Sequence, residues 1–160
     1  MSFALVLLSF FALFHLPPLR RLPALSTPAS RAAVAAGLFF IGAGVMHFLM
    51  PARYDAMIPP QLPSPRFWTL LSGVLEVAGG VGLLLPRTRR LASLGLIALL
   101  VAVLPANIHE AAANSASHVL PFPDWYFWLR LPFQLVYIAW VAWAGGLLPS
   151  QSRARRAMAG

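Results

Sequence analysis

The chain has 160 residues, of which 59% are hydrophobic and only 10% are charged, and its mean hydropathy is +0.75. A soluble domain of this length carries more charge on its surface, so the composition predicts an integral membrane protein. The net charge of +8 comes from short arginine clusters beside apolar runs, which favours a role in membrane orientation over nucleic-acid binding. The absence of cysteine excludes disulfides, thiolate metal sites and a cysteine nucleophile.

Residues 1–30 are predicted to form an extra hydrophobic helix and a proline-rich linker. The stretch from Met1 to Leu16 is apolar apart from two serines and His15, and no basic residue precedes it, so it lacks the positive region of a secretory signal. With about sixteen residues it is marginal for a full membrane span. We therefore expect either a short helix whose N-terminus lies outside or an interfacial segment, ended by the prolines from Pro17 onward.

Residues 31–148 are predicted to form the main domain, a four-helix transmembrane bundle in an all-α fold. Each of its four apolar runs is long enough to cross the hydrocarbon core of a bilayer as a helix. In the first run, Gly37, Gly42 and Gly44 are expected to mark close contacts between helices. The expected spans are Arg31–Met50, Phe67–Leu85, Leu91 to about Ala112 with Pro105 inside it, and Trp125 to about Leu148 with Asp124 as its N-cap and Pro132 inside it.

The connection between the first two spans is rich in proline. We expect a turn or two of helix over residues 51–58 and an extended chain over residues 59–65. This connection is too apolar to be a flexible linker. It is therefore predicted to pack as an outer cap over the mouth of the bundle, with Tyr54, Pro59 and Pro60 as its candidate functional residues.

The distribution of arginine predicts the orientation of the bundle. Nine of the twelve basic residues lie on one side, in residues 20–31, in the turn 86–90 and in the basic tail 149–160. By the positive-inside rule this side faces the cytoplasm, and the cap faces outward together with a polar loop over residues 114–123. Every basic residue is arginine, which indicates a GC-rich bacterial genome. We therefore expect a multi-pass protein of the bacterial cytoplasmic (inner) membrane with a cytoplasmic C-terminus.

Glu76 is the most unusual residue of the main domain, because it lies in the middle of the second span. A carboxyl group at that depth is costly unless it is paired, protonated or directed into a polar cavity. At helical spacing, Ser72, Gly79 and Gly80 fall on the same face as Glu76, and small residues let helices approach closely. The carboxyl group is therefore predicted to point into the bundle.

Polar side chains on all four spans lie at similar depth in the outer half of the bundle. Counted from the outer end of its own span, Glu76 lies roughly 13 Å down and Arg130 roughly 9 Å down. Polar groups on separate helices at one depth favour a shared pocket over separate contacts with lipid. The candidate pocket residues are His47, Glu76, Asn107, Arg130 and Gln134.

Each candidate also has a purely structural interpretation. Glu76 and Arg130 are suited to an ion pair that fixes the register of two helices. His47 is suited to donating a hydrogen bond to a nearby carbonyl, and Asn107 to satisfying backbone groups released by Pro105. The sequence contains no metal-ligand spacing and no phosphate, dinucleotide or hydrolase motif, so no metal, no motif-encoded cofactor and no catalytic residue is assigned.

Six motifs follow one another over about residues 31–146. They are Gly44–Phe48 with Pro51 and Tyr54, Ile58–Pro63, Ser72–Glu76 with Gly79 and Gly80, Pro86–Arg89, Pro105–Ile108, and Trp128–Pro132 with Gln134. In these motifs the chain resembles the DoxX-like bacterial membrane proteins. The resemblance implies a four-helix membrane bundle and an association with quinone-linked oxidation. It supplies no agreed role for the candidate pocket residues.

Two functions are expected from this pattern. In the first, the chain is a redox-associated subunit without its own electron carrier, and its pocket binds a small amphipathic molecule such as a quinone beside a redox partner protein. Glu76 then carries a proton, and His47 or Arg130 bonds a carbonyl oxygen of the ligand. In the alternative, the chain is a non-catalytic membrane assembly or interaction protein whose polar cluster is structural. A transporter ranks third, because four short spans show no internal repeat.

Overall fold

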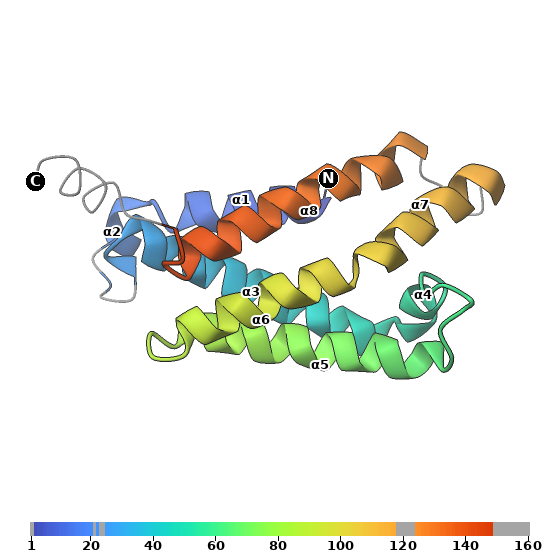
Figure 1. Ribbon diagram of the computed structural model, residues 1–160. Coiled ribbons are helices and arrows are strands. Elements are labelled where there is room, and N and C mark those ends of the chain that lie inside the picture. Colours follow the sequence, from blue (N-terminus) through green and yellow to red (C-terminus); the bar gives the residue numbers. More distant parts are fainter. Residues whose placement is uncertain (1, 21, 23–24, 118–123, 149–160) are drawn as a thin grey trace, which may run out of the picture.

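The computed structural model describes residues 2–20, 22, 25–117 and 124–148, and within these residues every regular element is a helix (Figure 1). The all-α prediction is therefore confirmed. The helices are α1 (Ser2–Leu13), α2 (Pro17–Arg20), α3 (Pro28–Leu49), α4 (Pro51–Asp55), α5 (Pro65–Leu84), α6 (Arg89–Ala102), α7 (Leu104–Ser117) and α8 (Asp124–Ala144).

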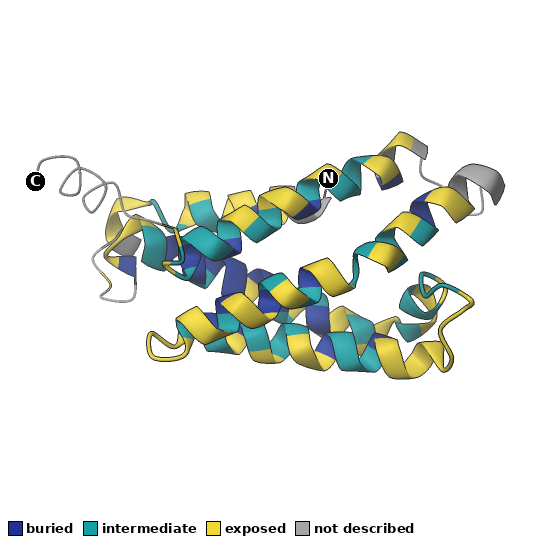
Figure 2. Ribbon diagram, viewed as in Figure 1, coloured by how far each residue is buried: buried dark blue, intermediate teal, exposed yellow. Residues whose placement is uncertain are grey.

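Among the residues that the structure describes, four segments are long and apolar enough to cross a membrane, which is the pattern of a multi-pass membrane protein. They are Pro28–Leu49, Pro65–Leu84, Arg89–Ala113 and Phe127–Ala144. Large apolar side chains such as Val74, Leu94 and Leu135 are exposed on the outer surface of these helices (Figure 2). A lipid bilayer provides the environment that such a surface requires.

The two ends of the bundle differ, and we name them by what they carry. The cap end carries α4 and the connection to α5. The tail end carries α2, the turn between α5 and α6, and the end of α8 (Figure 1). Toward the cap end, α7 and α8 stay together and diverge from α4 and α5 (Figure 1). The buried residues concentrate toward the tail end, where α1, α3 and α8 meet (Figure 2).

Helix α1 packs against the tail half of the bundle. Leu7 is buried in the main apolar cluster, and the ring of Phe11 meets the rings of Trp140 and Trp143 edge to face, with centroids 4.9 and 5.9 Å away. The twelve residues of α1 cover about 18 Å, which is less than the roughly 30 Å of a hydrocarbon core. The extra helix is thus part of the bundle, and it is too short to cross a membrane.

Glycines bring α3 and α5 into backbone contact at two places. A Cβ atom added to Gly37 would lie 2.9 Å from the carbonyl oxygen of Gly80, and one added to Gly44 would lie 2.7 Å from that of Gly73. Only glycine permits so close an approach of two helices. Gly42 faces open space, so the expectation that it marks a helix contact is wrong, and Gly79 faces Leu96 of α6 and not α3.

Proline divides the third predicted span into two helices. Helix α6 ends at Ala102 and α7 begins at Leu104, whereas the sequence predicted one helix through Pro105. Pro105 has no N–H to donate to the preceding turn, and its ring clashes with the carbonyl four residues back, so the helix breaks there. Helix α7 then continues to Ser117, so the predicted polar loop is helical over residues 114–117.

Several boundary predictions need correction or lie outside the described residues. Helix α3 begins at Pro28, before the predicted start, because Thr27 caps it by accepting a hydrogen bond from the backbone N–H of Ser30 at 3.0 Å. Helix α8 begins at Asp124, one residue before the predicted start at Trp125, and it ends at Ala144, before the predicted end near Leu148. The side chain of Asp124, residues 118–123 and the basic tail 149–160 lie outside what the structure describes.

The connection from α4 to α5 is compact. The sequence predicted an extended chain over residues 59–65, but Leu62 N–H donates to the carbonyl of Pro59 at 3.0 Å, which closes a turn. The extended prediction is therefore wrong, because the chain has to reverse its direction between two antiparallel neighbours. Ser64 adopts a left-handed conformation with φ of 55° immediately before Pro65 begins α5.

Candidate functional site

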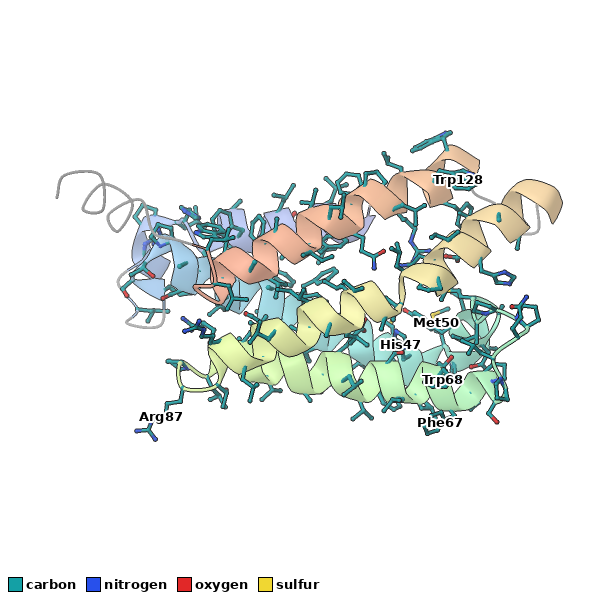
Figure 3. All side chains as sticks on the ribbon, in the orientation of Figure 1. His47, Met50, Phe67, Trp68, Arg87 and Trp128 are labelled. Atoms are coloured by element: carbon teal, nitrogen blue, oxygen red, sulfur yellow. The ribbon has the colours of Figure 1, made fainter. Side chains whose placement is uncertain are left out.

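The cap half of the bundle contains a partly open cavity of about 150 Å³. All five candidate pocket residues line it, and so does Tyr54 from the predicted cap, whereas Pro59 and Pro60 are not among its lining residues. Figure 3 shows His47 between the helices, while Phe67 and Arg87 point away from the bundle. The lining residues are Phe39, Phe40, Ala43, His47, Tyr54, Met57, Ile58, Thr69, Ser72, Glu76, Leu100, Val103, Ala106, Asn107, Arg130, Phe133, Gln134 and Tyr137.

His47 bridges α3 to two turns of α5. Its Nδ1 atom lies 2.9 Å from the carbonyl oxygen of Thr69, and its Nε2 atom lies 3.5 Å from Oε2 of Glu76. The close packing of Gly44 on Gly73 makes this reach possible, because a Cβ at Gly73 would lie 2.8 Å from Cβ of His47. The donor interpretation of His47 therefore agrees with its contact to Thr69. The same ring also faces the carboxyl group of Glu76.

The carboxyl group of Glu76 is incompletely bonded. Its Oε2 atom is buried and has no hydrogen-bond partner among the described residues, and the 3.5 Å contact to His47 is longer than a normal hydrogen bond. A buried polar atom without a partner is uncommon and costs about 1–3 kcal/mol. The structure therefore retains at this position a polar group that the chain itself does not fully satisfy.

Tyr54 of α4 covers the His47 ring from the cap side. The two rings are stacked, with centroids 3.8 Å apart and an angle of 23° between their planes. Burial, and then the nearby carboxylate of Glu76, raise the pKa of the Tyr54 phenol above its usual value. Tyr54 thus remains a neutral hydroxyl at pH 7, and it forms part of the cavity wall.

The second charged pair of the cap half differs from the predicted one. Arg130 donates a hydrogen bond to Oε2 of Glu110, not to Glu76. The predicted Glu76–Arg130 ion pair is therefore wrong. The break at Pro105 redirects α7, and α7 carries Glu110 along α8 to face Arg130. Glu110 lies one helical turn after Asn107, and this spacing was the signal that the sequence offered for it.

Gln134 repairs the broken third span. Its Nε2 atom donates to the carbonyl of Leu100, in the last turn of α6, and its Oε1 atom accepts from Nδ2 of Asn107 at 3.1 Å. The sequence assigned the repair of the break at Pro105 to Asn107. The repair is instead made by Gln134 from α8, and Asn107 holds the Gln134 amide in place.

The cap is fastened to the start of α5 at its outer surface. Arg66 Nε donates to Oδ2 of Asp55 at 2.9 Å, and Trp68 Nε1 donates to the carbonyl of Pro63 at 3.0 Å. Asp55 is partly desolvated, which opposes its ionisation. The Thr69 hydroxyl and the Arg66 guanidinium outweigh this effect and lower the pKa of Asp55 below its usual value.

The polar groups of the site thus fall into two sets with different chemistry. Arg130, Glu110, Gln134 and Asn107 are bonded to one another or to the backbone. Glu76 and His47 form an acid–imidazole pair at the cavity, which is an arrangement that can hold and transfer a proton. No group of three or more metal-ligating side chains occurs in the part of the chain that the structure describes.

Comparison with known proteins gives one family. A family model described as "Domain of unknown function (DUF8561)" matches residues 35–145, a range that contains every lining residue of the cavity. No curated protein and no solved structure matches the chain. The resemblance to DoxX-like proteins stays a prediction that this match does not test.

Proposed function

We propose that this chain, which belongs to the family described as a domain of unknown function (DUF8561), binds a small quinone-like amphipathic molecule in its cavity. In this proposal the chain is a redox-associated membrane subunit, in line with its resemblance to DoxX-like proteins. It has no encoded electron carrier, so electrons pass between the bound molecule and a redox partner protein. The contribution of the chain is to bind the head group and to exchange its proton.

One observation carries the proposal. Oε2 of Glu76 is buried and lacks a hydrogen-bond partner among the described residues, and Glu76 is one of the residues that line the cavity. A ligand with a polar head group would complete the bonding of this carboxyl group. His47 lies beside it as a second proton-carrying group, 3.5 Å away. Ligand sites of this kind are mostly apolar cavities with a few convergent polar groups.

The proposal also assigns an environment. The cap end faces outward from the bacterial cytoplasmic (inner) membrane and the basic tail lies in the cytoplasm, because nine of the twelve arginines occur in the sequence segments 20–31, 86–90 and 149–160, to which the positive-inside rule assigns the cytoplasmic side. The cavity then opens toward the outer half of the bilayer. The head group of a lipid-soluble ligand would enter it from there.

The alternative function is a non-catalytic assembly or interaction protein, and one observation favours it. Arg130 is paired with Glu110, and Gln134 bonds both Leu100 and Asn107. That part of the polar cluster therefore has a sufficient structural role without any ligand. The two functions differ in what Glu76 does, because Glu76 has no comparable structural contact.

The test is mass spectrometry of lipids that co-purify in mild detergent with the wild type and with Glu76→Gln. We expect a quinone or another ring-bearing lipid in the wild type and a loss of about fivefold or more in Glu76→Gln, equivalent to about 1 kcal/mol. Asp55→Asn is the matched control, since it makes the same acid-to-amide change at a carboxyl group outside the cavity lining. Equal lipid content in both folded proteins would favour the interaction function.

A further inference from the structure

Two ion pairs lie in the cap half, and the exposed Arg53 of α4 belongs to neither. Glu110 is paired with Arg130, and Asp55 is paired with Arg66. The remaining ionisable groups in the cavity wall are Glu76, which faces His47, and the phenols of Tyr54 and Tyr137. The charge of the cavity therefore depends on how many protons the pair of Glu76 and His47 carries.

The hydrogen bond between His47 and the Thr69 carbonyl determines how many protons the pair of Glu76 and His47 carries. The Thr69 carbonyl only accepts hydrogen bonds, so Nδ1 of His47 carries a proton and Nε2 is the nitrogen that faces Glu76. If Nε2 and Oε2 both presented lone pairs at 3.5 Å, they would repel each other in a dry site. One further proton therefore resides on the pair. With the proton on either atom, the pair has no net charge.

We infer that the cavity is specific for an uncharged, single-ring ligand that presents a hydroxyl group to Glu76. The inference rests on the proposed function and specifies its ligand class. A charged head group would enter a cavity whose own charges already cancel. It would have no counter-charge there, and an unpaired charge is expensive in a low-dielectric interior.

The hydroxyl requirement follows from the two proton positions. With the proton on His47, Glu76 is a carboxylate and accepts a hydrogen bond from the ligand. With the proton on Glu76 and directed to Nε2 of His47, the other carboxyl oxygen still accepts a hydrogen bond from the ligand. A hydroxyl group serves in both arrangements because it can donate a hydrogen bond to a carboxyl oxygen, whereas a carbonyl group only accepts. A phenol or quinol head group is therefore favoured over the corresponding ketone.

The ring requirement follows from the volume and walls of the cavity. A cavity of about 150 Å³ is the size at which an engineered apolar cavity in another protein binds benzene. The aromatic rings of Phe39, Tyr54, Phe133 and Tyr137 contribute to its walls, and such walls suit the face or the edge of a ring. A single ring fits this volume.

The experiment compares three probes of one shape, para-hexylphenol, para-hexylbenzoate and hexylbenzene. Binding to the full chain in lipid nanodiscs is measured by titration calorimetry, with empty nanodiscs subtracted to remove partition into lipid. We expect the phenol to bind at least tenfold more tightly than either of the other probes. Binding of the benzoate or of hexylbenzene within threefold of the phenol would overturn the inference.

A variant tests whether Glu76 is the origin of the selectivity. Glu76→Leu removes an unpartnered buried oxygen, and replacing such a group by an apolar one of similar size is expected to leave the fold intact. The preference for the phenol over hexylbenzene should fall from tenfold or more to less than threefold. A folded Glu76→Leu protein that keeps the tenfold preference would overturn the assignment of the hydroxyl contact to Glu76.

The outcomes separate this inference from the proposed function. Tight benzoate binding, together with a co-purifying lipid that depends on Glu76, would contradict the inferred ligand class but not the proposed function. Failure of all three probes to bind, together with equal lipid content in the wild type and Glu76→Gln, would contradict both the inferred ligand class and the proposed function.

Discussion

The tail half and the cap half of the bundle solve the packing problem in opposite ways. In the tail half, α3 and α5 touch at Gly37 and Gly80, and buried Leu83, Leu96 and Val141 fill the space between the helices. In the cap half the same helices diverge from α7 and α8, and a few polar side chains take part in lining a mostly apolar cavity. The comparison indicates that the tail half supplies most of the stability. The cap half is then free to hold groups that packing alone would exclude.

The largest loss of stability is expected when a methyl group is added at the glycine contact of the tail half. In Gly80→Ala the new Cβ would lie 2.7 Å from the carbonyl oxygen of Gly37 and 3.0 Å from the backbone nitrogen of Ile41. Backbone atoms cannot move aside as a side chain can, so we expect a loss of about 3 kcal/mol. The measurement is reversible unfolding in mixed detergent micelles, followed by circular dichroism.

Gly42→Ala is the matched control for that prediction. It adds the same methyl group to α3 where nothing lies within 4 Å. Alanine has the higher helix propensity, so the change is expected to be neutral or to stabilise by up to about 1 kcal/mol. Equal losses in Gly80→Ala and Gly42→Ala would show that the backbone contact does not distinguish the tail half.

A smaller effect is expected from the charged pair in the cap half. Arg130→Gln leaves the buried carboxyl group of Glu110 without its partner, and Glu110→Gln does the same to Arg130. Because both side chains retain some exposure, we expect each change to cost about 2 kcal/mol, below the range for fully buried pairs. The double variant should lose less than the sum of the two, which a double-mutant cycle measures. Additive losses would contradict the pairing.

The hydrogen bonds of Gln134 at the junction of α6 and α7 are expected to contribute less to stability than the charged pair. Gln134→Leu leaves the Leu100 carbonyl and the Asn107 amide without their partner, at a cost of about 1.5 kcal/mol. Asn107→Leu removes only the second of these bonds and should cost less. Hydrogen exchange should show faster opening around the α6–α7 junction in Gln134→Leu. If the two variants are equally stable, the bond to Leu100 contributes little to holding the junction.

The sequence predicted five members of the polar cluster, missed Glu110, and did not predict the contacts among them. Counting residues gives the depth of a side chain, and depth alone grouped His47, Glu76, Asn107, Arg130 and Gln134 correctly around one cavity. Contacts depend on how far each helix is rotated about its axis and on where a helix bends. Neither quantity follows from residue counts.

Two corrections illustrate this limit. The break at Pro105 carries Glu110 to Arg130, and this left Glu76 with His47 instead of the predicted arginine. Gly42 and Gly44 are two residues apart, so a rotation of roughly 200° separates them. One therefore faces open space while the other contacts α5. Glycine content alone predicted both as contacts.

The smallest effect on stability is expected from the ion pair between Asp55 and Arg66, which links the cap to α5. The folded protein lowers the pKa of Asp55, so its stabilising contribution is complete above the pKa of an unfolded aspartate, about 3.9, and is lost as the pH falls through the lower folded value. Arg66 is largely exposed, so the pair contributes at most about 0.5 kcal/mol.

Hydrogen exchange of residues 51–64 should therefore quicken relative to the tail half when the pH is lowered from 5 to 3, after correction for the intrinsic pH dependence of exchange. Asp55→Asn should abolish this pH dependence, and Arg53→Gln, which changes an exposed arginine of the same cap, should keep it. If the tail half responded as strongly as the cap, the two halves would open together. Because Tyr54 of the cap covers His47, independent opening of the cap would also give a ligand its route to the cavity.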